Sequence, residues 1–209
     1  MKKIPLLLLF PLLAACATPQ IAVNPRADFS AVKRVAVISF NGPKGDLAAD
    51  MLTQSLLSHG ADVVERQRLS SVMQEQSLSS GLFDQATAKQ LGKLLGVDAL
   101  FVGTVAESTP PSTYMVSSSN ASLVTSVTGV SSGNIHSEGS VLGLPNTQLL
   151  STAANVSLVA RMVDVETGSI LWSASMSYEG FDIPSAMTAI TDSFTSSLVP
   201  IWPALYHVK

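Results

Sequence analysis

The chain is poor in the residues on which most protein chemistry depends. It has one cysteine, Cys16, among 209 residues, so no internal disulfide can form. Its three histidines, His59, His136 and His207, lie too far apart in sequence for the ligand spacing of a structural metal site. No pair of carboxylates stands out against an apolar background, as an acid/base couple would. The sequence therefore predicts no enzyme, no metal site and no cofactor.

Charge is also scarce. Charged residues make up 13% of the chain, and the mean hydropathy is +0.36. If residues 1–15 are removed, Lys2 and Lys3 go with them, leaving 10 of the 12 basic residues against 15 acidic ones, a formal charge of −5. A nucleic-acid partner would require clustered lysine and arginine, so this class of partner is excluded. The low charge indicates a surface that is partly buried against another molecule.

The chain begins with an export signal. Lys2 and Lys3 form a basic segment, and residues 4–13 are almost entirely apolar. This apolar stretch is too short to span a membrane, which takes about 20 residues. It runs into Leu13-Ala14-Ala15-Cys16, which resembles the bacterial lipobox, where the thiol receives a diacylglycerol and the signal is cut just before it. The alternative is an ordinary small-residue cleavage site with an incidental cysteine.

We therefore expect a signal peptide over residues 1–15 and lipid attachment at Cys16, with an N-acyl chain such as palmitate. Two or more acyl chains give stable membrane attachment. Because the next residue is Ala17 and not aspartate, the sorting rule of Gram-negative lipoproteins favours the outer membrane, with the domain facing the periplasm. Residues 16–30 contain two prolines and little periodicity, which predicts a lipidated tether.

Strand and helix patterns alternate after the tether. Short β-rich runs predict strands at residues 34–40, 62–64 and 99–105, and apolar i, i+4 spacing predicts helices at 47–57, 67–78 and 84–96. Asp46 is placed to cap the first helix and Gly60 to end it. A late hairpin at residues 156–177 and a helix starting at Pro184 complete the pattern. The predicted fold class is α/β, a mixed sheet with flanking helices in two or three layers.

A Ser-rich segment interrupts this pattern. Residues 108–160 contain a single charge, Glu138. The segment is either a disordered low-complexity loop or an extended β-hairpin, and its valine and leucine content favours the hairpin. We therefore predict one domain over residues 31–200, with an insertion at about 108–155 and a C-terminal tail at 201–209.

Two local motifs suggest chemistry only weakly. Residues 129–133 match G-x-S-x-G around Ser131, but no helix follows, as a nucleophile elbow requires. Gly42 and Gly45 lie between a strand and a helix, where amides can hold a phosphate, yet the complete phosphate-loop pattern is missing. A chance match and a plain turn are the favoured interpretations. Trp172 and Trp202 are expected in the core.

Three stretches together carry a family resemblance. They are residues 35–40 (VAVISF), residues 64–76 continuing to 91–103 (LGKLLGVDALFVG), and residues 160–172 (ARMVDVETGSILW). Their order and spacing resemble the CsgG/HfaB family of outer-membrane lipoproteins, which act in curli-type secretion and holdfast-anchor assembly. The resemblance covers roughly residues 31–200 except the Ser-rich segment. It implies a periplasmic α/β domain, a homo-oligomer, and a secreted or envelope protein as partner.

The resemblance also marks a departure from the family pattern. In the curli member, subunits form a ring and each adds two β-hairpins to a shared transmembrane pore. The first would follow Val105, where the Ser-rich segment lies, and the second would follow Trp172, where residues 178–184 lead straight into a helix. Smaller family members regulate cell-wall synthases or support flagella without a pore.

Three functions are therefore compared. The leading one is a non-enzymatic outer-membrane lipoprotein that acts as an oligomer in the assembly or secretion of a surface structure. The alternative is a periplasmic regulator that binds a peptidoglycan synthase or a flagellar component without a pore. A lipid-anchored hydrolase is the third, and it rests on the motif around Ser131 alone.

Overall fold

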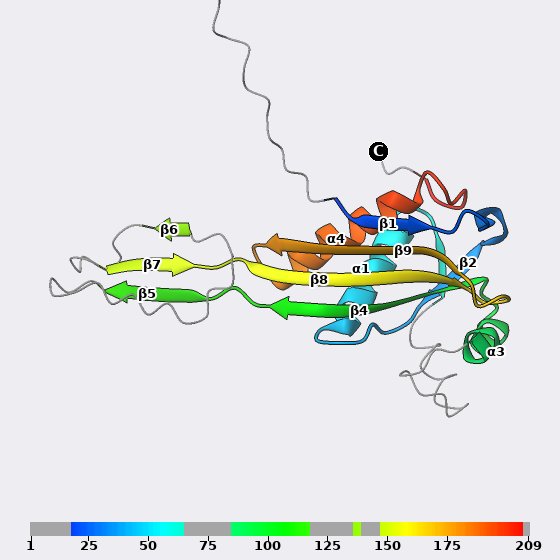
Figure 1. Cartoon of the computed structure of the whole chain (residues 1–209), viewed down its shortest axis with the longest axis horizontal. Helices are drawn as coiled ribbons and strands as arrows, with labels where there is room; N and C mark the ends of the chain where they lie inside the picture. Colours follow the sequence, from blue (N-terminus) through cyan, green and yellow to red (C-terminus); the bar gives the residue numbers. More distant parts are fainter. Residues whose placement is uncertain (1–17, 65–84, 118–135, 139–146, 207–209) are drawn as a thin grey trace, which may run out of the picture.

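The computed structural model describes residues 18–64, 85–117, 136–138 and 147–206. Its body is a six-stranded sheet with the order β1-β9-β8-β4-β2-β3 (Figure 1). The strands are β1 (Gln20–Val23), β2 (Arg34–Val37), β3 (Asp62–Val64), β4 (Ala99–Thr109), β8 (Ala154–Asp164) and β9 (Ile170–Gly180). The pairs β2–β3 and β2–β4 are parallel and the other pairs are antiparallel, so the sheet is mixed, as predicted.

Helices cover both faces of part of this sheet. Helices α1 (Gly45–Ser58) and α4 (Ile183–Leu198) pack against each other and against one face, behind the strands in Figure 1. Helix α3 (Gln85–Leu95) contacts β4 and, through Leu95, joins a second, smaller core on the opposite face. The predicted α/β class is confirmed, with three layers where α3 lies.

An aromatic cluster holds the main core together. Phe101 packs edge-to-face on Trp172 with ring centroids 6.2 Å apart, and Trp172 packs on Phe194 at 5.7 Å. Trp202 lies 6.3 Å from Phe101, and its Nε1 donates a 2.8 Å hydrogen bond to the Val32 carbonyl oxygen. Both tryptophans are fully buried, as expected. The described part of the segment 201–209, expected as a tail, therefore contributes two core residues, Trp202 and Leu205.

The late hairpin and the last helix follow their sequence patterns closely. Alternate residues of β8 are buried, in keeping with the period of two that a half-covered strand shows; they are Val156, Leu158, Ala160 and Met162. The apolar residues at i, i+4 spacing in α4 are fully buried; they are Ala186, Ile190, Phe194 and Leu198. Helix α4 therefore packs its apolar side against the buried side chains of β8 and β9.

Two local expectations are wrong. The segment 16–30, predicted as a tether, contains β1, which pairs antiparallel with β9 from Gln20↔Ser175 to Val23↔Trp172. Asp46 is not the cap of α1, because the N-cap is Lys44, in a left-handed conformation with φ 61° and no side-chain capping bond. Asp46 lies instead in the first turn of the helix, where the helix dipole stabilises a carboxylate.

The Ser-rich insertion projects from one end of the sheet (Figure 1). It contains a second sheet of order β5-β7-β6, with β5 (Thr113–Ser117) antiparallel to β7 (Thr147–Ser151) and β6 (His136–Glu138) beside β7. At its base, Ser112 and Thr152 exchange hydrogen bonds of 2.8 and 3.0 Å. The described strands thus favour the hairpin over the loop, and residues 118–135 and 139–146 lie outside the described ranges.

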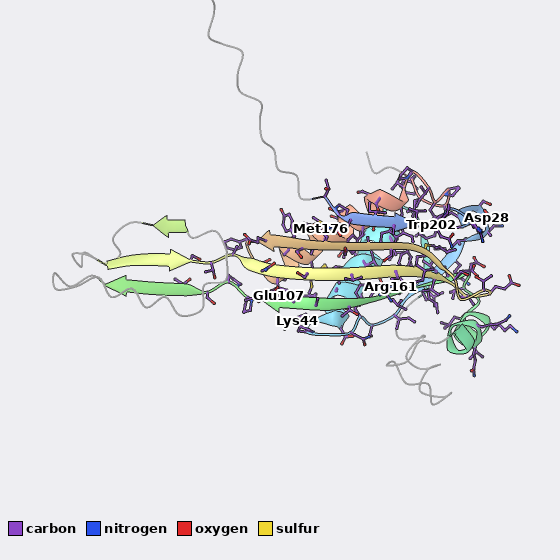
Figure 2. The ribbon with its side chains drawn as sticks, in the orientation of Figure 1. Asp28, Lys44, Glu107, Arg161, Met176 and Trp202 are labelled. Carbon is purple, nitrogen blue, oxygen red and sulfur yellow. The ribbon has the colours of Figure 1, made fainter. Side chains whose placement is uncertain are left out.

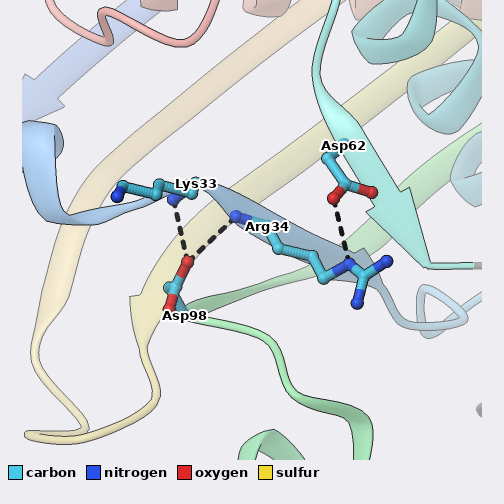
Figure 3. Close-up of polar contacts among 4 residues, drawn as sticks. All are labelled: Lys33, Arg34, Asp62 and Asp98. Carbon is cyan, nitrogen blue, oxygen red and sulfur yellow. Dashed lines mark hydrogen bonds and ion pairs between the residues drawn. The ribbon is translucent and has the colours of Figure 1, made fainter.

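The opposite end of the sheet is fastened by Asp98 (Figure 3). One Asp98 carboxylate oxygen accepts hydrogen bonds from the amides of Lys33 and Arg34, at 2.8 and 2.9 Å. We expect Asp98→Ala to lower the free energy of unfolding by about 1–2 kcal/mol, because both amides lose a charged acceptor at a solvent-exposed site. Urea unfolding followed by circular dichroism measures this loss.

Asp62→Ala is the matched control for this prediction. Asp62 pairs with the Arg34 guanidinium at 3.0 Å, but the two side chains are 59% and 47% exposed (Figure 3). Exposed ion pairs of this kind contribute about 0–1 kcal/mol. If both substitutions cost the same, the amide bonds to Asp98 do not fasten the strand.

Candidate interaction surface

Half of the sheet's second face is polar and uncovered by the described helices. In β9, Trp172, Ala174 and Met176 are buried toward α1 and α4, so the residues between them point to the opposite side of the sheet. The two residues between them are Ser173 and Ser175, and the next residue on this side is Ser177. On this side α3 reaches only the β2–β4 half. We call the exposed half, on β1, β9, β8 and the middle of β4, the open face.

The strand register lines up the residues of the open face in rows that are mostly polar. One row runs Thr104, Val159, Ser175, Gln20 across four strands, and the hydroxyls of Ser157 and Ser177 lie 2.7 Å apart. A shallow groove of about 400 Å³ lies over these rows and is lined by Thr18, Gln20, Ser157, Leu158, Val159, Ser175, Met176 and Ser177. The open face is therefore rich in hydroxyl groups and carries a shallow groove.

Few charges interrupt the open face. Arg161 is exposed and pairs with Ser173 in the neighbouring row. It lies toward the end of the sheet opposite the insertion (Figure 2). Glu107 lies near the other end, where β4 approaches the insertion (Figure 2). Between them the surface offers hydroxyl donors and acceptors, which adapt to a partner's groups because a hydroxyl hydrogen rotates.

The lipid site predicted from the sequence lies just upstream of this groove. Cys16 falls outside the described residues, and the first described residue, Thr18, lines the groove together with Ser177. Ser131, the weak candidate nucleophile, also falls outside them. Because Cys16 is two residues before Thr18, the predicted lipid site lies close to the open face.

The glycines between β2 and α1 form a packed turn. Gly42 has φ +93°, and a Cβ there would meet the Val105 carbonyl oxygen at 2.2 Å. A Cβ on Gly45 would meet the Phe40 carbonyl oxygen at 1.8 Å, and the Gly45 amide donates to the Gly42 carbonyl at 3.2 Å. These glycines allow close backbone packing of the turn. The plain-turn interpretation accounts for both, with one of the amides already bonded.

A serine, a histidine and an aspartate approach one another between α1 and α4 without forming a triad. The buried Ser55 hydroxyl donates directly to the Asp192 carboxylate at 2.7 Å. The His59 ring nitrogen Nδ1 lies 2.9 Å from the Ser55 carbonyl oxygen instead of the hydroxyl. A nucleophile needs the base on its hydroxyl and access to a substrate. This cluster joins two helices and has neither feature.

Across the described ranges, no three histidine, cysteine, aspartate or glutamate side chains gather as metal ligands. Within the same ranges, no helix is both long and apolar enough to cross a bilayer.

Sequence reasoning missed the serine row of the open face. The signal was present, because residues 171–177 read LWSASMS, a strict alternation of apolar and serine residues from Trp172 onward. The alternation reveals a two-sided strand. Which side stays open depends on the strand order and on the position of α3, and neither is a local property of the sequence.

These features define a class of protein: an α/β domain with a lipobox-like N-terminus and a projecting hairpin. Residues 14–110 match the family described as curli production assembly/transport component CsgG. This match confirms, over residues 14–110, the family resemblance seen in the sequence. No curated protein sequence shows significant similarity to the chain.

Solved structures that are similar at low identity include the PelC dodecamer from Paraburkholderia phytofirmans (16% identity, 92% of this chain and 99% of that one, TM-score 0.43), lipoprotein GNA1162 from Neisseria meningitidis (17%, 81% and 97%, 0.43) and the LpoB C-terminal domain from Escherichia coli (16%, 73% and 87%, 0.43). Likenesses this distant carry no argument about function.

Proposed function

We propose that this protein is a non-enzymatic outer-membrane lipoprotein that assembles as an oligomer and acts in the assembly or secretion of a cell-surface structure. The observation that carries the proposal is the CsgG-family match over residues 14–110, which begins within the lipobox-like sequence and runs to the base of the insertion. The hairpin strands β5 and β7 occupy the position at which the family resemblance implies an insertion. Its partner is a secreted or envelope protein.

The open face supports the oligomeric part of the proposal. It is an uncovered part of the sheet bordered by β1, an edge strand whose four residues are all exposed. An edge strand presents unpaired backbone groups that a second chain can bind. Small hydroxyl side chains beside such an edge allow close approach of two sheets or strands. A neighbouring copy that binds here would bury the low-charge surface of the chain.

Blocking the open face tests the oligomer. We expect the lipidated protein, extracted in detergent, to form rings in electron micrographs and to have an oligomeric mass by light scattering. Ser175→Tyr, at the centre of the open face, should reduce this mass to that of a monomer, because a large side chain prevents close approach.

Ser196→Tyr is the matched control, since it makes the same exchange at another position. Ser196 is exposed on α4, away from the open face, and the same added ring there should leave the oligomer intact. A parent protein that stays monomeric in detergent and in lipid would contradict the proposal.

One feature favours the second candidate, a periplasmic regulator of a peptidoglycan synthase or flagellar component. The structure has no second hairpin at the end of the described strand β9, because β9 ends at Gly180 and α4 begins at Ile183. A pull-down from envelope extract distinguishes the two functions. Recovery of a synthase with no ring in micrographs favours the regulator.

A further inference from the structure

Phe181 stands out on the surface. Its side chain is 90% exposed, and the next most exposed large apolar side chain among the described residues, Tyr206, is 58% exposed. Burying a phenylalanine side chain is worth about 1.5–3 kcal/mol, so full exposure is an unusual arrangement for this residue. Packing within the described fold does not account for it.

The fold holds the Phe181 ring on a rigid turn. Asp182 caps α4 by accepting a 2.8 Å hydrogen bond from the Ser185 amide, and the Ser185 hydroxyl accepts from the Asp182 amide at 3.2 Å. Hydrogen bonds from the side chain and amide of Ser185 lower the pKa of the Asp182 carboxyl, so the cap keeps its charge at neutral pH. On the other side, a Cβ on Gly180 would meet Ala186 at 3.0 Å, which shows that α4 packs directly on the turn.

Phe181 lies at the end of the sheet where the lipid anchor enters. Because β1 is antiparallel to β9, the start of β1 and the end of β9 lie at the same end of the sheet (Figure 1). Thr18 and Ser177 line one groove. Phe181 is four residues beyond Ser177, about 13 Å along an extended strand. Cys16 is two residues before Thr18, at most about 7 Å.

The surroundings of the ring indicate what it contacts. Glu179, Pro184 and Ser185 are exposed beside it, and none of the other large exposed apolar side chains of the described ranges lies in this turn. Protein-binding hot spots usually sit within a packed apolar patch. A single aromatic side chain is enough for the membrane interface, where such rings settle at the level of the lipid head groups.

We propose that Phe181 inserts into the lipid surface and, together with the anchor on Cys16, fixes the orientation of the domain on the membrane. This inference rests on the lipidation that is part of the proposed function. One flexible link holds a domain at a membrane but leaves it free to turn, and a second contact removes that freedom. With both contacts made, the end of the sheet that carries the insertion faces the bilayer.

Fluorescence quenching tests the contact. Phe181→Trp is made in the full-length lipidated protein, which is reconstituted in phosphatidylethanolamine and phosphatidylcholine vesicles with or without brominated acyl chains. We expect the added indole to shift its emission to the blue and to be quenched by bromine. Trp172 and Trp202 are fully buried and supply a background that the parent protein measures.

Tyr206→Trp is the matched control. Tyr206 is exposed and packs against Gly60 at the C-terminal end of α1, whereas Phe181 lies near the start of α4. An indole at position 206 should not be quenched. Quenching at both positions, or at neither, overturns the proposal, and so does a blue shift at position 181 in detergent that bromine does not quench, which places the ring in a protein contact. Protein that carries no acyl chain contradicts the proposed function instead, so the two failures are distinguishable.

Discussion

Cys16→Ser is expected to abolish labelling of the protein by radioactive fatty acid, because the serine hydroxyl cannot form the thioether that carries the diacylglycerol. The protein should move from the membrane pellet to the soluble periplasm or remain as an uncleaved precursor at the inner membrane. Cell fractionation and labelling in the same culture measure both effects. Function should fail as well, since the anchor supplies the local concentration on which an oligomer or partner contact depends.

The folded domain should survive this substitution. The buried core begins at Phe29 and Val32 and depends on elements far from the anchor. Circular dichroism and the urea midpoint of the Cys16→Ser protein should therefore match those of the lipidated protein in detergent. Ala17→Ser, one residue away, is the matched control and should keep both the label and the membrane location. Cys16→Ser protein that still takes label would contradict the lipobox interpretation.

Trp172→Ala should cause the largest loss of stability, about 3–5 kcal/mol, which is typical for removal of a large buried aromatic side chain. Its ring is fully buried between Phe101 and Phe194, and its Nε1 donates to the Ser197 hydroxyl at 3.2 Å. Since domains are stable by about 5–15 kcal/mol, this loss removes much of the total. Urea unfolding followed by circular dichroism provides the measurement.

Ile170→Ala is the matched control for the tryptophan substitution. Ile170 is the first residue of the same strand but is 47% exposed, so its truncation should cost below about 1 kcal/mol. If Trp172→Ala cost no more than Ile170→Ala, the aromatic cluster would not be the centre of the core.

Elements with a strong apolar period could be predicted from the sequence. The spacing in α4 and the alternation in β8 each require one covered face, so local sequence is enough to define them. Strand β1 could not be predicted, because its four residues are all exposed and the apolar run at residues 21–23 is too short to indicate a strand. It forms through backbone bonds to β9, a strand about 150 residues later in the chain. Lys44 replaces Asp46 as the cap because close packing of Gly45 on Phe40 sets the turn.

The candidate sites also differ in whether the sequence alone predicts them. The lipid site at Cys16 is a linear motif, so the sequence alone predicts it. The open face and Phe181 depend on which surfaces remain uncovered after α1, α3 and α4 have packed, and only the assembled fold contains that information.

The pairing of β1 with β9 also determines the mechanical length of the link to the membrane. With β1 paired, the sheet begins at Gln20, four positions after Cys16, a reach of about 14 Å. If β1 detached, the first buried residue would be Phe29, thirteen positions after Cys16, and the link could reach about 45 Å. A pull on the lipid along the strand loads the four paired positions of β1 in shear, all at once. The pairing of β1 with β9 thus keeps the link short, and its loss would more than triple the distance that the link can span between the domain and its anchor.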